Sequence, residues 1–238
     1  MLSLVFSSCR KEASSSVSTN PNIVNGCEII QAQVVTTNLV SHQVHTYINQ
    51  YQYDSLGRLT YAGDDLGNDS SHFHYHDNDC DDDNHGSWHS SSNGYTVSSE
   101  GPRGRYQYSY DGNGYLQLEI YTDSSGFGPD DSYTESYYWD NNNNLSLSIK
   151  QYSSQTIPLT TTYSYYTDKA NQVLVPSTLQ LGKHSRNLIQ QKTSSEGNTV
   201  VSSYSYSYIY DGSGKVAQYT ETNQGHQQAV YTLIYSCH

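Results

Sequence analysis

The chain has 238 residues, of which 14% are charged and 34% hydrophobic, and this combination excludes a charge-rich disordered chain. A net charge of −12 without any cluster of Lys and Arg excludes nucleic acid as a partner, because binding phosphates requires a basic face. Tyr accounts for 25 residues, against 3 Phe and 2 Trp, and Tyr favours strands. The composition therefore predicts an all-β protein.

The first residues resemble a bacterial lipoprotein signal. An apolar stretch, residues 1–6, leads into two serines and Cys9, and residues 10–26 are polar and rich in Ser and Asn. We expect residues 1–9 to be a signal, truncated at its start, that ends at a lipidated Cys9, followed by a flexible tether. The alternative is a buried N-terminal strand with a free thiol. The lipid anchor predicts attachment to the outer membrane of a bacterial cell envelope, facing the periplasm or the cell surface.

Cysteines bound the remaining region, residues 27–238, which we expect to form a single domain. Cys27 opens this region and Cys237 closes it. A disulfide between them is plausible in an oxidising envelope compartment. Cys80 is then left over, in the most unusual segment of the chain.

A short motif with an aromatic residue, an Asp and turn residues recurs along the domain. Its clear copies are YDSLGRL at 53–59, YDGNGYL at 110–116, WDNNNNL at 139–145 and YDGSGKV at 210–216. With two weaker copies, the aspartates at positions 54, 83, 111, 140 and 168 are 28 or 29 residues apart. Asp followed by Gly or Asn with positive φ favours a three-residue hairpin loop. The period predicts two strands of about ten residues plus two turns.

The alternation of side chains along a strand assigns the two faces of each hairpin. Pairing of Tyr110 with Leu116 predicts that tyrosines and leucines share one face. The residues expected on this inner face in two successive hairpins are Tyr106, Tyr108, Tyr110, Leu116, Leu118 and Ile120, and then Tyr137, Trp139, Leu145, Leu147 and Ile149. The outer face should carry Ser, Gln, Glu, Thr and Asn.

The Y-D-x-x-G-x-L core of these copies resembles the tyrosine–aspartate repeats of Rhs and teneurin-type proteins. Together with the lipoprotein signal that ends at Cys9, this repeat makes the chain similar to small repeat lipoproteins of Bacteroidota, including a family associated with a porphyrin ligand. The resemblance covers residues 45–220. It implies a series of hairpins and, from that family, haem or another porphyrin as the ligand.

We predict an antiparallel meander of roughly 12–14 strands with this ~28-residue period, forming a curved open sheet or a partly closed barrel. Residues 67–104, rich in His and Asp, are expected to be an irregular insertion in it. Alternating ten-residue strands also describe an outer-membrane barrel. The lipid anchor would be redundant in such a barrel, and the chain ends without a terminal aromatic residue, so the water-facing sheet is favoured.

The insertion also holds the candidate metal ligands. In a strand over 71–76, alternate histidines project from one face, as they do in sites for Zn or other transition metals and near haem iron. Alternating aspartates are typical of calcium loops, although the Gly and the terminal Glu of such loops are missing here. The candidate ligands are His72, His74, His76, His85, His89, Asp77, Asp79 and Asp81. A solvated polar loop without any ion is the alternative.

Tyrosines provide the candidate ligand-binding face, because their rings stack on flat ligands such as a porphyrin or a sugar. The residues are Tyr106, Tyr108, Tyr110, Tyr204, Tyr206 and Tyr208. Ordinary packing of half-buried strands is the alternative explanation. No nucleophile elbow or phosphate-binding loop is present, so we expect no enzyme. The function predicted is a ligand-binding envelope lipoprotein; the alternatives are a structural or adhesive module that contacts proteins or glycans, and a metal-binding loop at 72–89.

Overall fold

The computed structural model describes residues 27–55, 58–65, 70–76, 79–82, 86–91, 95–101, 103–124, 130–173, 181–224 and 226–237. Sixteen strands lie in this part of the chain. The first eight are β1 (Cys27–Asn38), β2 (Val44–Tyr53), β3 (Leu59–Asp64), β4 (Ser70–His76), β5 (Asp79–Asp82), β6 (Ser87–Ser90), β7 (Thr96–Gly101) and β8 (Gly104–Tyr110). The others are β9 (Leu116–Asp123), β10 (Tyr133–Trp139), β11 (Leu145–Tyr152), β12 (Leu159–Ala170), β13 (Asn187–Glu196), β14 (Thr199–Tyr210), β15 (Val216–Asn223) and β16 (Gln227–Cys237).

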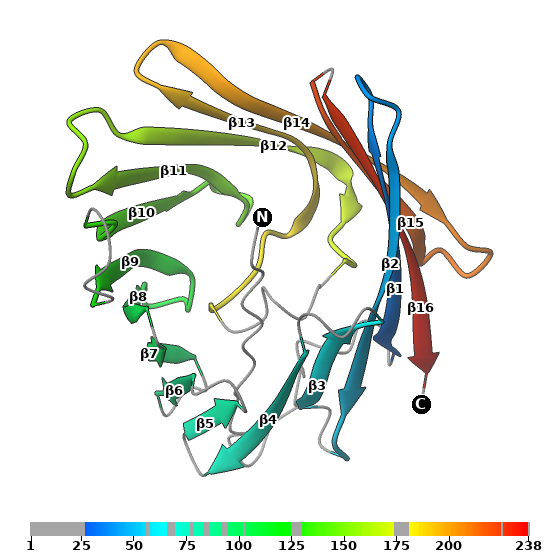
Figure 1. Cartoon of the computed structure of the whole chain (residues 1–238), viewed down its shortest axis with the longest axis horizontal. Helices are drawn as coiled ribbons and strands as arrows, with labels where there is room; N and C mark the ends of the chain where they lie inside the picture. The colour runs from blue at the N-terminus through cyan, green and yellow to red at the C-terminus, as the bar shows by residue number, and fades with distance from the viewer. Residues whose placement is uncertain are drawn as a thin grey trace.

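Every strand pairs antiparallel with its neighbours in the chain, and β1 pairs with β16, so the meander closes into a barrel (Figure 1). The prediction of an all-β antiparallel meander is confirmed, with closure complete and with sixteen strands where 12–14 were expected. The described residues contain no helix long and apolar enough to cross a membrane.

The additional strands come from residues 67–104, and the prediction of an irregular insertion there is wrong. β4 to β7 pair in order and continue the barrel wall between β3 and β8. In β4 the side chain of Phe73 is buried, while His72 and His74 on either side of it are exposed. This period-two alternation is that of a strand, although the segment's His and Asp content is unusual for one.

The predicted hairpin turns form at all four clear motif copies. The backbone N–H of the motif Asp donates to the carbonyl four residues ahead at Asp54, Asp111, Asp140 and Asp211. The positive φ falls on Gly114, Asn143 and Gly214 in the last three turns. The 28-residue period does not extend to every copy, because Asp168 lies inside β12; Asp83 is outside the described residues.

Each of these hairpins also contains a register shift next to its turn. Beyond the shift, the side chains lie on the opposite face of the sheet from the one that simple alternation predicts. Tyr110 is opposite Leu116, as predicted, but the shift between Ser109 and Tyr110 then places Tyr108 opposite Glu119. Leu118 is consequently opposite Ser109, on the other face. The prediction that Leu118 and Ile120 share the inner face with the tyrosines is therefore wrong. One extra residue in a strand moves every side chain beyond it to the other face of the sheet.

The next hairpin shows the same correction. A shift between Tyr138 and Trp139 places Leu147 opposite Tyr138 and Ser148 opposite Tyr137. Ile149 is opposite Ser136, so Leu147 and Ile149 do not share the face of Tyr137. Corresponding shifts lie between Gln52 and Tyr53 and between Ile209 and Tyr210.

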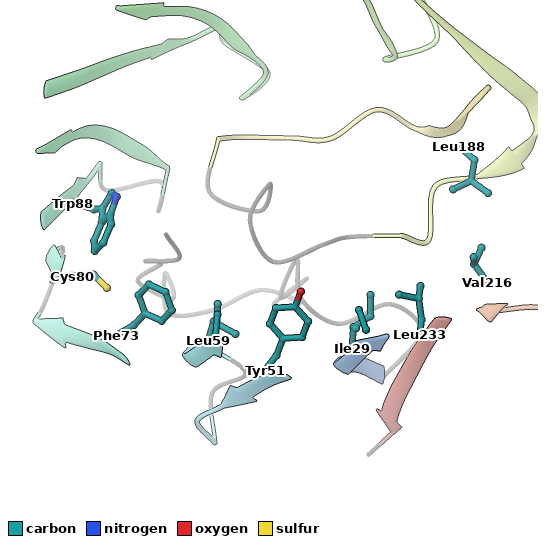
Figure 2. Close-up of a cluster of buried hydrophobic side chains, with 11 residues drawn as sticks. Ile29, Tyr51, Leu59, Phe73, Cys80, Trp88, Leu188, Val216 and Leu233 are labelled. Atoms are coloured by element: carbon teal, nitrogen blue, oxygen red, sulfur yellow. The ribbon is translucent and has the colours of Figure 1, made fainter. Parts of the chain in front are cut away.

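The hydrophobic core lies inside the barrel. Figure 2 shows its side chains pointing into the interior from strands all around one part of the wall. The labelled members are Ile29, Tyr51, Leu59, Phe73, Cys80, Trp88, Leu188, Val216 and Leu233. The side chains that point inward, together, are called the inner wall below, and those on the opposite face the outer wall.

A disulfide links Cys27 to Cys237 across the β1–β16 pair. These two residues are separated by 210 positions, so the bond joins the first and last strands of the barrel. Cys80 is buried and is also disulfide-bonded. The predicted lipid anchor, Cys9, lies outside the described residues.

Candidate functional site

Rows of tyrosine rings run across the inner wall. Trp88 points inward (Figure 2). The residues directly across from it in successive strands are Ser99, Tyr106 and Tyr121, which therefore share its face. The first row consists of Tyr106, Tyr121, Tyr133 and Tyr152 on β8 to β11, with successive ring centroids 4.7, 5.4 and 5.6 Å apart. The second consists of Tyr208, Tyr219 and Tyr231 on β14 to β16, with spacings of 6.2 and 4.3 Å.

A buried carboxylate lies beside the first tyrosine row. Glu119 is only 8% exposed, and two phenol hydroxyls donate to it. Tyr133 Oη lies 2.5 Å from Oε1, and Tyr137 Oη lies 3.3 Å from Oε2. Burial raises the pKa of Glu119, while hydrogen bonds from the two phenols oppose this rise. Burial, followed by the charge of Glu119, raises the pKa of both phenols, so they remain hydrogen-bond donors.

An ion pair continues this cluster on the next two strands. Lys150 Nζ lies 3.0 Å from Glu135 Oε2 and 3.8 Å from the ring centroid of Tyr133. The cation thus sits between a carboxylate and an aromatic face, and each attracts a positive charge. In register order the four neighbours are Tyr108, Glu119, Glu135 and Lys150. We call these four residues with Tyr133 and Tyr137 the β8–β11 cluster.

The six tyrosines predicted to bind a ligand lie on the inner wall, but in two groups. Tyr106, Tyr108 and Tyr110 belong to β8, and Tyr204, Tyr206 and Tyr208 belong to β14, with β9 to β13 between them (Figure 1). Some of them also have structural roles. The hydroxyl of Tyr110 donates to the Thr96 carbonyl, and that of Tyr208 to the Ile189 carbonyl.

The predicted metal ligands lie on the outer wall. His72, His74 and His76 alternate with the inward-pointing Phe73 and are exposed, as is His89 on β6. His76 Nε2 lies 3.8 Å from Asp81 Oδ2. Within the described residues, no three His, Cys, Asp or Glu side chains are grouped closely enough to hold a metal ion. His85 and Asp77 are outside those residues, and of Asp79 only the backbone position in β5 is described.

The barrel wall consequently separates the two halves of the expected haem site. The tyrosines point inward and the described histidines of 72–89 point outward, so they do not form one face. Haem binding itself stays a prediction. The tyrosine hydroxyls have raised pKa values, because burial disfavours their ionised form, and this opposes a tyrosinate ligand for iron.

Sequence reasoning missed the charged residues of the inner wall. Simple alternation from the turn places Glu119 and Lys150 on the outer face. Glu135, two residues before Tyr137, lies on the tyrosine face by the same alternation and was not considered. The signal that identifies them is the bulge that accompanies a three-residue hairpin loop. Shifting the alternation by one residue beyond each such turn moves Glu119 and Lys150 to the tyrosine face.

A partly buried histidine is a further residue that the sequence did not indicate. His184 lies two residues after Gly182, which forms an isolated β-bridge with Tyr115. Its Nε2 atom is buried and has no hydrogen-bond partner among the residues that the structure describes. Burial lowers the pKa of His184 to about 4, so the ring is neutral at pH 7.

No family model matches the chain, and no curated protein matches it. Two solved structures have a similar fold. A porin-like protein from Bacteroides uniformis ATCC 8492 aligns with a TM-score of 0.64 at 16% identity, covering 87% of this chain and 98% of that one. A porin-like protein from Bacteroides vulgatus ATCC 8482 aligns with a TM-score of 0.59 at 12% identity, over the same shares of the two chains. At such identities the likeness establishes the barrel fold.

Proposed function

We propose that this protein is a non-enzymatic barrel of the bacterial cell envelope that binds a small polar ligand on its tyrosine-lined inner wall. The observation that carries the proposal is the β8–β11 cluster, in which carboxylates and an ammonium group stand among aromatic rings inside the barrel. Binding sites combine aromatic surface with a few polar groups that fix orientation.

The outer wall supports a barrel whose outer surface is in water. A membrane barrel presents to lipid a continuous apolar band about 25 Å tall. Here the outward positions, taken from the register on both sides of the β1–β16 closure, mix apolar residues with uncharged polar ones. Examples are Gln33, Val35, Ile48, Gln50, Ser205, Ser207, Gln218, Thr220, Val230 and Thr232. Strands with such a surface are not expected to insert into a bilayer.

The porin-like names of the structural neighbours support an envelope location. A direct test is flotation of the full, unlipidated chain with phospholipid vesicles. We expect the protein to stay at the bottom of the gradient. Flotation with the vesicles would contradict the water-facing outer wall.

Ligand binding is tested by titrating the full chain with haemin, followed in the Soret region, and with a panel of sugars, followed by calorimetry. The variant Tyr133→Phe removes one hydroxyl from the inner wall and keeps the ring. Tyr138→Phe is the matched control, because Tyr138 is 49% exposed and faces outward beside Leu147. We expect saturable binding that Tyr133→Phe weakens and Tyr138→Phe does not. Absence of any saturable ligand would favour a structural or adhesive module.

A further inference from the structure

Two hairpins on different parts of the wall have closely similar sequences at an offset of 100 residues. Y-x-Y-x-Y-D-G-x-G occurs at 106–114 and again at 206–214. In β8–β9, Tyr108 is opposite Glu119 and Tyr106 is opposite Tyr121. In β14–β15 the positions of the two pairs along the strands are exchanged. The fold thus builds a Tyr–Glu pair beside a Tyr–Tyr pair twice.

In the second hairpin, Tyr206 is opposite Glu221 and Tyr208 is opposite Tyr219. Burial, followed by the charge of Glu221, raises the pKa of Tyr206. The row of rings continues to Tyr231, whose ring stacks on that of Tyr219 with an interplanar angle of 6°. Leu233 points into the barrel in Figure 2, and Tyr231 lies two residues before it on β16, so this cluster also belongs to the inner wall.

The two hairpins differ in the cation. Beyond Glu119 the next inner-wall positions are Glu135 and Lys150. The Lys150 ammonium contacts the carboxylate of Glu135 and the ring of Tyr133. Beyond Glu221 the corresponding positions are Ala229 and then Thr36. Both are small and uncharged. Among the described residues, Glu221 forms no ion pair.

The surroundings of Glu221 are negative and aromatic. The charge of Glu221 acts on the pKa of Tyr206 and Tyr231, each raised first by burial. The pKa of Tyr47 is raised by burial and then by the charges of Asp64 and Glu221. Lys192 lies on the same wall one row away, opposite Tyr204, and not in the row of Glu221.

We propose that Glu221, with the rings of Tyr206, Tyr219 and Tyr231, binds the primary ammonium group of an alkylamine. The ligand's ammonium takes the place that the chain's own Lys150 occupies in the β8–β11 cluster. This inference rests on the proposed function, because it names the ligand class of the inner wall. The carboxylate supplies the opposite charge, and the tyrosines supply ring faces and hydroxyl oxygens.

The test is calorimetric titration of the full chain with n-pentylamine, whose five carbons correspond to Cα to Cε of lysine, and with 1-pentanol as the uncharged control. We expect one equivalent of pentylamine to bind and pentanol not to bind. Glu221→Gln keeps the shape of the side chain and should weaken binding at least tenfold. Thr220→Ala, on the adjacent outward position, should leave binding unchanged. Equal binding of pentanol, or unchanged binding by Glu221→Gln, would overturn the proposal.

Two further variants test the comparison between the hairpins. Thr36→Lys supplies an internal ammonium two strands from Glu221, as Lys150 does for Glu119, and should abolish binding. Lys150→Met empties the first position and should raise the stoichiometry from one to two. Circular dichroism verifies that each variant is folded. Binding by Thr36→Lys with the affinity of the unmodified protein would contradict the inference, as would an unchanged stoichiometry with Lys150→Met.

The two proposals fail separately. If pentylamine does not bind but haemin or a sugar binds with sensitivity to Tyr133→Phe, the ammonium site is wrong and the proposed function stands. If no ligand gives saturable binding, both are wrong.

Discussion

Tyr108 and Glu119 lie directly opposite each other on β8 and β9, both on the inner wall of the barrel. A one-residue shift next to Tyr110 produces this pairing, and the same shift turns Leu118 outward. Because each motif hairpin has a corresponding bulge, charged residues collect inside the barrel. The bulges therefore determine the chemistry of the inner wall.

The hydroxyl of Tyr133 should contribute measurably to stability. It donates to the buried carboxylate of Glu119 at 2.5 Å, and hydrogen bonds to charged groups contribute about 1.5–3 kcal/mol. We expect Tyr133→Phe to lower the free energy of unfolding in urea by an amount in that range. Tyr138→Phe, on the outer wall, should change it by less than about 0.5 kcal/mol. Equal effects of the two variants would contradict the assigned role of Glu119 as an acceptor.

The disulfide between Cys27 and Cys237 should stabilise the barrel strongly. It links residues 210 positions apart, for which the chain-entropy model gives about 5 kcal/mol. We expect the double variant Cys27→Ser, Cys237→Ser to melt at a clearly lower temperature, measured by circular dichroism. Hydrogen exchange should be faster at β1 and β16 than at β10 and β11. An unchanged melting temperature would show that strand pairing alone keeps the barrel closed.

Two glycines in equivalent turns should respond differently to replacement by alanine. Gly214 has φ +82° and open space where a Cβ would lie, so Gly214→Ala should cost only the backbone strain, about 1–2 kcal/mol. Gly114 has φ +87°, and its Cβ would lie 2.6 Å from the Tyr95 hydroxyl oxygen, so Gly114→Ala should cost more. Asn143→Gly, at φ +64°, should be tolerated. Thermal melting of the three variants checks this order, and a costlier Gly214→Ala would contradict it.

His184 should make stability depend on pH. Its folded-state pKa of about 4 lies below the ordinary value of 6.5, so the unfolded chain binds the proton more tightly. The contribution is complete above pH 6.5 and is lost as the pH falls towards 4, by about 3 kcal/mol in total. We expect the free energy of unfolding to fall less over this range in His184→Leu than in the unmodified protein. If the two proteins lost stability equally over this pH range, folding would leave the pKa of His184 unchanged, which contradicts the prediction.

The turn chemistry allowed much of the fold to be predicted. Asp111, Gly114 and the tyrosines of β8 are local signals, and they predict a hairpin without knowledge of the rest of the chain. Closure was not predictable in this way, because the pairing of β1 with β16 depends on residues about 200 positions apart. The short strands over 70–101 were missed because their composition is unusual, although Phe73 between exposed histidines follows strand alternation.

The candidate site was predicted only in part. Alternation identified Tyr106 and Tyr108 as neighbours on one face, and their rings are stacked with centroids 6.1 Å apart. It could not identify Glu119 as their neighbour, because a bulge changes the face without changing the composition of the sequence. The histidines were assigned correctly to a common face of β4, but which side of the wall that face occupies depends on the closed barrel.

The covalent link between the first and last strands makes the polypeptide from Cys27 to Cys237 a single loop. One proteolytic cut at any exposed turn, such as the one at Asp211, would leave both pieces joined through this bond. A protease must cut twice before a fragment can leave. In a compartment that contains proteases, a single cut in a turn would therefore leave a nicked barrel. The disulfide and the remaining strand pairs would hold its two pieces together.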